Sequence, residues 1–221
     1  MKLSKGVISL IVITLVIIID QVSKFWVKTN FYLGEDLEIF SWFHLYFIEN
    51  NGMAFGMEIG SKLLLTLFRI IVVTLGIWYI CKIKSRSYVK RGYVVCLSLI
   101  IAGALGNIID CVFYGEIFNN PPAPEVAQFL PIEGGYGTWL HGRVVDMLYF
   151  PLFSFVWPDW MPFVGGEEFL FFQPVFNIAD AAITVGIIVL ILFYSKYLSK
   201  EHEEKEMRMK TKAEQQTIKT E

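Results

Sequence analysis

Residues 7–24 read VISLIVITLVIIIDQVSK. The apolar run at the start of this stretch, with its flanking residues, is long enough to cross roughly 30 Å of hydrocarbon as one helix. It ends in polar and charged residues, Asp20, Gln21 and Lys24, which are costly inside a membrane unless they have partners. The stretch therefore predicts a membrane-spanning helix over about residues 6–27 with polar groups at one end.

A cleaved secretion signal is the competing interpretation of this first segment, because Lys2 and Lys5 precede the apolar run. No cleavage site of the small-x-small type follows the run. We therefore expect the segment to be retained as the first of several spans.

Three further apolar segments have the length of a membrane span, at about residues 62–81, 92–113 and 177–197. The whole chain is 55% hydrophobic with a mean hydropathy of +0.52, well above an ordinary soluble domain. These features predict an α-helical integral membrane protein with four transmembrane helices, built as one domain over residues 1–198. Residues 199–221 are rich in Lys and Glu and are expected to form a polar tail.

The charge distribution predicts how the chain is oriented. The link between the second and third spans, residues 82–91, holds five basic residues and no acid, which is typical of a cytoplasmic loop. Four spans then place both termini in the cytoplasm and the acidic, aromatic-rich loops 28–61 and 114–176 outside. In the first of these loops, residues 37–48 predict part of a small extracytoplasmic β-sheet, with a turn signal at Asn50-Asn51-Gly52. The second, rich in Pro, Gly and Trp, is expected to lie on the membrane surface.

Ionisable side chains inside the spans are candidate functional groups, because each costs several kcal/mol unless it is paired or hydrated. Asp20, Arg69 and Asp110 meet this description, and the expected topology places all three in the outer half of their helices. Arg69 is expected to pair with a carboxylate or a lipid phosphate, and Asp110 with Arg69 or Lys24. Asn107 lies three residues before Asp110, so the two share a helix face.

Two more aspartates fall in the same outer layer. Asp180 lies at the start of the fourth span, where Asn177 can act as the helix N-cap, so a capping role alone would explain it. Asp146 follows Val144 and Val145, which predict a short extended segment, and its simplest alternative is an ordinary loop acid. A pair of carboxylates at a membrane surface points to acid–base chemistry on a membrane-embedded substrate.

Five short motifs occur in order along the chain. They are Asp20-Gln21 with Lys24, Asn50-Asn-Gly52-Met-Ala-Phe-Gly56, Gly103-Ala-Leu-Gly106-Asn107-Ile-Ile-Asp110, Gly142-Arg143-Val-Val-Asp146, and Phe176-Asn177-Ile-Ala-Asp180-Ala-Ala-Ile183. Together the motifs, over about residues 10–195, resemble those of the lipoprotein signal peptidases, also called signal peptidase II. The resemblance implies an aspartyl endopeptidase that cleaves diacylglyceryl-modified prolipoproteins just before the lipidated cysteine, with Asp146 and Asp180 as the catalytic pair.

The same resemblance suggests roles for the neighbouring residues. Two adjacent carboxylates do not ionise equally, so we expect Asp180, at a helix N-terminus, to be the anion that activates water and Asp146 to start protonated. Asn50, Asn107 and Asn177 are expected to hydrogen-bond the extended substrate. Gly52 is expected to give its loop backbone freedom, while Asp20 and Asp110 are expected to brace the helices.

The chain departs from the family pattern in two places. The third motif commonly continues Asp-Arg, but here Asp110 is followed by Cys111, and the stretch from Asp110 to Asp146 is longer than expected. We hypothesise that Arg143 supplies the missing cation and binds backbone carbonyls or lipid headgroup oxygens of the substrate. Normal turnover and affinity in Arg143→Ala would contradict this hypothesis.

The resemblance also implies partners and a location. The expected partners are lipid-modified prolipoproteins, membrane lipids and peptide-like inhibitors such as globomycin, with no nucleic acid, cofactor or metal. The expected location is the bacterial inner membrane, crossed several times, with the site at the periplasmic face. Two other classes stay open from the residues alone: a small polytopic transporter, whose polar residues would be spread through the membrane depth, and a non-catalytic assembly factor, which would tolerate loss of both aspartates.

Overall fold

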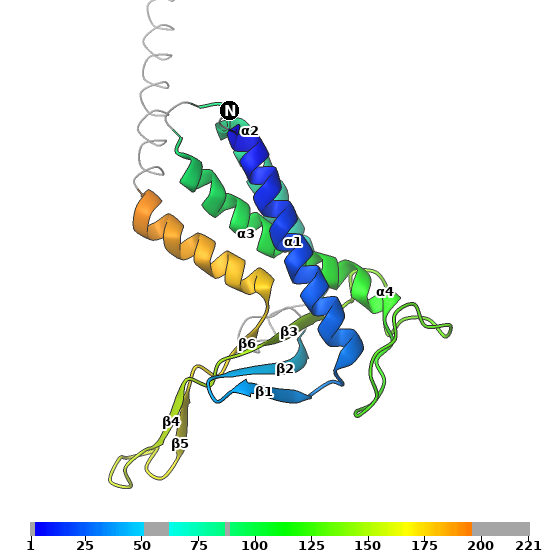
Figure 1. Cartoon of the computed structure of the whole chain (residues 1–221), viewed down its shortest axis with the longest axis vertical. Coiled ribbons are helices and arrows are strands. Elements are labelled where there is room, and N and C mark those ends of the chain that lie inside the picture. Colours follow the sequence, from blue (N-terminus) through cyan, green and yellow to red (C-terminus); the bar gives the residue numbers. More distant parts are fainter. Residues whose placement is uncertain (1–2, 51–61, 87–88, 196–221) are drawn as a thin grey trace, which may run out of the picture.

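The computed structural model describes residues 3–50, 62–86 and 89–195 (Figure 1). Within these residues, four helices are long and apolar enough to cross a membrane. They are α1 (Lys5–Asn30), α2 (Lys62–Ile83), the helix formed by α3 (Arg91–Ile109) and its continuation to Ile117, and a last helix (Ile178–Ser195), which has no label in Figure 1. The four predicted spans are confirmed, each within a few residues of its expected bounds.

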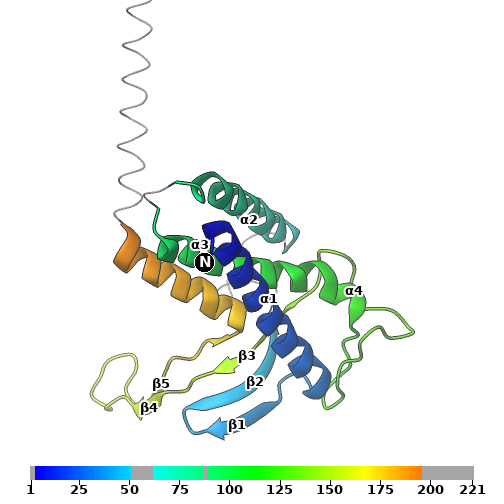
Figure 2. The ribbon, with the colours of Figure 1, turned by 45° about the horizontal axis from the view of Figure 1, so that its top comes forward.

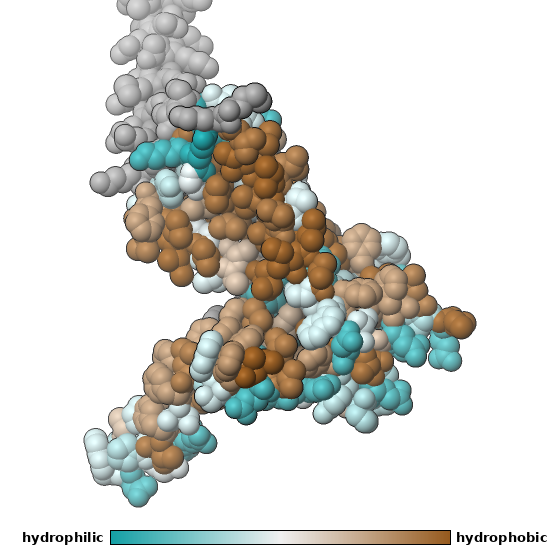
Figure 3. Space-filling view, viewed as in Figure 1, coloured by the Kyte–Doolittle hydropathy of each residue, from teal (hydrophilic) through white to brown (hydrophobic). Residues whose placement is uncertain are grey.

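α3 is the central helix of the bundle, lying between α2 and the last helix, with α1 packed along it (Figure 2). Small residues on α3 make this packing possible. A Cβ atom on Gly103 would lie 2.2 Å from the carbonyl oxygen of Ala179, and one on Gly106 would lie 2.5 Å from a carboxylate oxygen of Asp20. α3 is largely buried, whereas the other spans expose the apolar side chains that form the brown surface in Figure 3.

A π-helical segment, η2 (Asp110–Tyr114), continues α3 and leads into the short α4 (Gly115–Ile117). The chain that returns toward the bundle hydrogen-bonds to carbonyl groups of this segment. The Gly142 N–H donates to the Cys111 carbonyl at 2.8 Å, and the Leu140 N–H donates to the Val112 carbonyl at 3.2 Å. A Cβ atom on Gly142 would lie 2.0 Å from the Asp110 carbonyl oxygen, so only glycine allows this close approach.

A four-stranded antiparallel sheet lies at the end of the bundle opposite the N-terminus (Figure 1). Its strands occur in the order β1 (Asp36–Phe40), β2 (Phe43–Asn50), β3 (Val144–Tyr149) and β6 (Val175–Phe176). β4 (Phe153–Val156) and β5 (Glu168–Phe171) form a separate hairpin with several exposed aromatic side chains. The predicted small sheet is confirmed, while the side of the membrane on which it lies stays a prediction.

The first loop is organised differently from the expectation. Residues 37–48, expected as one strand-like stretch, form two strands because the chain reverses at Ser41 and Trp42. Stacked rings hold this reversal in place: Trp42 lies parallel to Phe40 at 5.5 Å and to Phe150 at 6.2 Å. β2 then ends at Asn50, and Asn51 and Gly52 lie outside the described residues.

Candidate active site

Asp146 lies in the middle of the sheet and is only 1% exposed. β2 pairs with β3 on one side, placing Ile48 opposite Asp146, and β6 pairs with β3 on the other side. The extended segment predicted at Val144 and Val145 is confirmed as the start of β3. Because the loop before β3 is bound to the π-helical segment through Gly142, the depth of Asp146 relative to the helices is set by backbone contacts.

Asp180 lies in the first turn of the last helix. Its N–H donates to Oδ1 of Asn177 at 2.9 Å, so Asn177 is the N-cap that the sequence predicted. The carboxylate of Asp180 therefore lies near the positive end of the helix dipole, which favours negative charge. Unlike Asp146, the side chain is partly exposed, so it is accessible from outside the packed core.

Two asparagines connect the two aspartates. Nδ2 of Asn177 donates to Oδ1 of Asp146 at 2.6 Å, and Nδ2 of Asn107 donates to Oδ1 of Asp180 at 2.8 Å. The asparagines also contact each other, because Nδ2 of Asn177 lies 3.2 Å from Oδ1 of Asn107. Asn50, from the end of β2, donates to the second oxygen of Asp146. The two carboxylates, from distant parts of the chain, thus belong to one hydrogen-bonded site.

The buried cation Lys24 determines which way the Asn107 amide points. Its Nζ lies 2.9 Å from Oδ1 of Asn107. An ammonium group can only donate hydrogen bonds, so the amide oxygen must face Lys24 and the amide nitrogen must face Asp180. The orientation of Asn177 is set in the same way, because its oxygen accepts from the Asp180 N–H and its nitrogen therefore faces Asp146.

Beneath this site, Lys24 is held between two buried carboxylates. Its Nζ lies 2.9 Å from Oδ2 of Asp20 and 2.8 Å from Oδ2 of Asp110, and all three side chains are fully buried. Gln21 donates to both aspartates, at 3.1 Å and 2.9 Å. Of the two partners expected for Asp110, the structure places Lys24 in this role.

The two supporting aspartates also contact the elements that carry the candidate catalytic pair. Oδ1 of Asp20 accepts the N–H of Ala179 at 2.9 Å, next to Asp180 in the last helix. Oδ2 of Asp110 accepts the N–H of Val145 at 3.4 Å, next to Asp146 in β3. Asp20 and Asp110 therefore each accept a hydrogen bond from the backbone N–H next to one aspartate of the candidate pair.

The environment of Asp146 makes its proton hard to remove. Burial first, and then the negative charge of Asp180, raise the pKa of Asp146 to about 8. The charge of Lys24 and the hydrogen bond from Asn177 oppose this rise but are smaller. At neutral pH the Asp146 carboxyl is therefore mainly protonated and can donate a proton.

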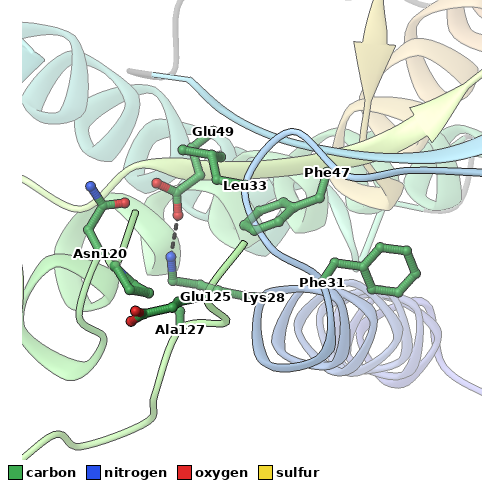
Figure 4. A pocket seen from close by; sticks show the side chains of 9 residues that line it. Lys28, Phe31, Leu33, Phe47, Glu49, Asn120, Glu125 and Ala127 are labelled. Carbon is green, nitrogen blue, oxygen red and sulfur yellow. Dashed lines mark hydrogen bonds and ion pairs between the residues drawn. The ribbon is translucent and has the colours of Figure 1, made fainter. Parts of the chain in front are cut away.

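Arg143 lies at the edge of the site. Its Nη1 is 3.3 Å from Oε2 of Glu49, and its guanidinium lies 5.0 Å from the centre of the Tyr136 ring. Glu49 also pairs with Lys28 of α1, as Figure 4 shows, within a ring-lined environment that includes Phe47. Because Glu49 directly precedes Asn50, this ion-pair cluster fixes the end of β2 against α1 and the loop before Asp146.

Sequence reasoning assigned no role to Lys28 or Glu49, and it named Lys24 only as a possible partner of Asp110 and Gln21 only as part of a motif. Lys24 carried a usable signal, since it lies four residues after Asp20, on the same face of the helix. Glu49 had no such signal, because its partners come from α1 and from the loop before β3. Of the residues that were predicted, Gly52 lies outside the described residues, and the others contribute to the contacts above.

A family described as signal peptidase (SPase) II has a model that matches residues 12–196 of this chain. The chain belongs to the signal peptidase II family. The predicted family and the predicted aspartic peptidase class are thereby confirmed.

Similar proteins agree with membership of the signal peptidase II family. A lipoprotein signal peptidase of Porphyromonas gingivalis is 49% identical over 198 residues, covering 90% of this chain and 87% of the relative. One from Amoebophilus asiaticus is 39% identical, covering 80% of this chain and 73% of the relative. A solved bacterial membrane enzyme is 25% identical with a TM-score of 0.59, covering 87% of this chain and 90% of that one. The family model, over residues 12–196, spans the four helices and the sheet.

Proposed function

We propose that this signal peptidase II removes signal peptides from diacylglyceryl-modified prolipoproteins by cleaving the peptide bond before the lipidated cysteine. One observation carries the proposal: Asp146 and Asp180 are joined through Asn177 and Asn107 at the sheet end of the membrane helices. Two carboxylates in one site, one of them held protonated, form the acid–base pair of an aspartic peptidase.

The proposed reaction divides the roles between the two aspartates. Asp180 accepts a proton from water as the water oxygen attacks the scissile carbonyl carbon, while Asp146 gives its proton to the carbonyl oxygen. The resulting diol then collapses and the C–N bond breaks. The proton on Asp180 passes to the leaving amine, and Asp146 recovers a proton from the diol. Both residues return to their starting states.

The position of the pair suits a lipid-anchored substrate. Withdrawing the diacylglyceryl chains from the bilayer would cost roughly 0.8 kcal/mol per CH₂ group, so the site must meet the peptide at the membrane. The basic link between α2 and α3 lies at the opposite end of the bundle, which supports a cytoplasmic location for that end and a periplasmic location for the site. In this arrangement the enzyme lies in the inner membrane, and globomycin-like peptides compete with substrate at the aspartates.

The proposal is tested with the purified protein reconstituted in lipid vesicles and two matched precursor peptides, one diacylglyceryl-modified at cysteine and one unmodified. We expect cleavage before the modified cysteine, with a kcat/KM at least about 100-fold higher than for the unmodified peptide, since acyl chain burial concentrates substrate at the site. Mass spectrometry of the products identifies the bond. Absence of cleavage of the modified peptide would contradict the proposed substrate, and equal cleavage of both peptides would remove the lipid requirement.

The raised pKa of Asp146 predicts how activity depends on pH. The reaction needs Asp146 protonated, so kcat/KM should fall as pH rises through about 8, approaching a tenfold loss for each further pH unit. The measurement is a pH profile of kcat/KM from pH 5 to 10 in vesicles. A profile that stays flat to pH 10 would contradict the assignment of Asp146 as the acid.

The same pKa can be measured without substrate, through stability. Asp146 titrates near pH 4 when unfolded and near pH 8 when folded, so between these values the folded state holds the extra proton. Its contribution to the free energy of unfolding is therefore most favourable below pH 4 and is lost as pH rises to about 8. Wild type should therefore lose stability from pH 4 to pH 8, whereas Asp146→Asn should not lose this contribution. We expect the difference in Tm, Asp146→Asn minus wild type, to increase from pH 4 to pH 8 and to stay constant above it. A difference independent of pH would contradict the raised pKa.

A further inference from the structure

The beginning of α1 lies beside the end of α2, at the end of the bundle opposite the sheet (Figure 1). Nζ of Lys5, the first residue of α1, donates to the carbonyl of Arg86, three residues after the end of α2. Farther into the bundle, both helices pack against α3. A groove open to the outside remains between α1 and α2.

The groove is apolar and has a volume of about 170 Å³. Leu10 and Ile13 of α1 line one wall, and Ile77 and Ile80 of α2 line the other. Within each pair the residues are three positions apart, so each wall is one face of a helix. The hydroxyl of Ser9, which also lines the groove, is buried and accepts a hydrogen bond from α3 at 2.8 Å. The groove therefore has the shape and surface that suit a hydrocarbon chain lying along the helices.

A polar cavity of about 360 Å³ continues from the end of this groove. It is lined by Lys5 and Lys84, one from each side, and by the hydroxyl-bearing Ser4. A Cβ atom added to Gly6 would lie 3.4 Å from Cδ of Lys84, so the stem of this lysine lies close to α1. An ammonium group has three donors, so Lys5 can bind an anion and keep its bond to the backbone.

The charges of the spans are segregated between the two ends of the bundle. Within the described residues of the four spans, the acidic side chains all fall in the half of each helix toward the sheet; they are Asp20, Asp110, Glu116 and Asp180. The link over residues 82–91 holds five basic residues and no acid. A cationic cavity above an apolar groove complements a lipid with a negative headgroup above its acyl chain.

We propose that the groove between α1 and α2 binds one anionic glycerophospholipid. Its phosphate lies between Lys5 and Lys84, and one acyl chain lies between the apolar faces of the two helices. A zwitterionic lipid suits the site less well, because its own cation would lie among the basic residues of the link. The bound lipid joins α1 to α2 across the groove and so stabilises the bundle. The inference does not depend on the proposed function.

The test is lipid binding to the full-length protein in detergent, followed by native mass spectrometry and by Tm. Phosphatidylglycerol and phosphatidylcholine with the same acyl chains are the two probes. We expect one tightly bound phosphatidylglycerol, with a Kd at least about tenfold lower than that of phosphatidylcholine. At about ten times its Kd, phosphatidylglycerol should raise Tm by about 3–6 °C.

The headgroup site is tested with the double variant Lys5→Ala/Lys84→Ala. Its Kd for phosphatidylglycerol should rise about tenfold or more, since each lysine near a headgroup contributes roughly fivefold. Lys82→Ala/Lys90→Ala is the matched control, because it removes two exposed cations at the same end that do not line the groove. Lys82 instead lies over the Trp78 ring at 4.9 Å.

The acyl-chain site is tested with Ile77→Trp, which fills the groove and keeps both lysines. Its Kd for phosphatidylglycerol should rise at least about tenfold, the effect of displacing about two CH₂ groups. Leu75→Trp is the control, because Leu75 is exposed and lies two residues away, on the opposite face of α2. The Tm of each variant without added lipid shows whether it folds.

Four outcomes would overturn the inference. Equal affinity for the two lipids is the first, and an equal loss in the two double-lysine variants is the second, since either would mean a general effect of surface charge. The third is the same Tm increase with inorganic phosphate alone, which would mean a site for a free anion. The fourth is full affinity for phosphatidylglycerol in Ile77→Trp. None of these measurements uses peptide cleavage, so failure here leaves the proposed function standing.

Discussion

Replacing Asp146 by asparagine is expected to lower kcat for the lipid-modified peptide by at least about 10³-fold. Asparagine has nearly the same shape, but its amide cannot supply an acidic proton to the scissile carbonyl. It also cannot accept from both Asn50 and Asn177, because one of its two polar atoms is now a donor. The measurement is the initial rate of peptide cleavage in vesicles at pH 7.

Asp180→Asn is expected to cause a loss of similar size by removing the base that activates water. The two carboxylates act as a unit, so the double variant should be little worse than either single variant. Asp159→Asn is the matched control, because Asp159 is an exposed acid in the loop between β4 and β5. Comparable membrane insertion and Tm show that the variants fold. Activity within tenfold of wild type in either single variant would refute the catalytic pair.

Lys24→Met is expected to be the most destabilising single substitution around the site, lowering the free energy of unfolding by about 3–5 kcal/mol. Methionine fills a similar volume but leaves the carboxylates of Asp20 and Asp110 fully buried without their cation. It also removes the donor that orients Asn107, so remaining folded protein should cleave slowly. The measurements are Tm in detergent and kcat in vesicles.

A double variant tests whether buried, uncompensated carboxylates cause the loss of stability in Lys24→Met. Adding Asp110→Asn to Lys24→Met removes one of the two buried carboxylates that have lost their cation. The double variant should therefore recover part of the lost Tm, although each substitution also removes a native contact. Lys82→Met, which changes an exposed cation elsewhere in the membrane helices, should leave Tm within a degree or two. A Tm in Lys24→Met equal to that of wild type would show that the buried cluster does not stabilise the fold.

Much of the helical architecture could be predicted because each span is a local property. A run of about 20 apolar residues forms a membrane helix whatever its neighbours are, and the structure confirms all four. The N-cap at Asn177 is also local, since donor and acceptor are three residues apart. The path of residues 118–143 was not predictable, because its contacts with α1 and with the π-helical segment depend on distant parts of the chain. The chain reversal at Ser41 and Trp42 was missed because the ring of Phe150, just after β3, completes its stack.

The sequence by itself determined the four spans and the order of the motifs, and it singled out Asp146 and Asp180 as the candidate pair, because these depend on local hydropathy and on residue type. Only the tertiary structure decided that Asn107 and Asn177 join the aspartates and that Lys24 orients the Asn107 amide. The raised pKa of Asp146 also comes from the tertiary structure, since it reflects burial and the charge of a residue 34 positions away in the chain. The same holds for Arg69, whose approach to Cys111 is a packing contact between two helices. The orientation and protonation of a side chain depend on all the groups around it in space. Many of these groups come from distant parts of the chain, so residue spacing does not reveal them.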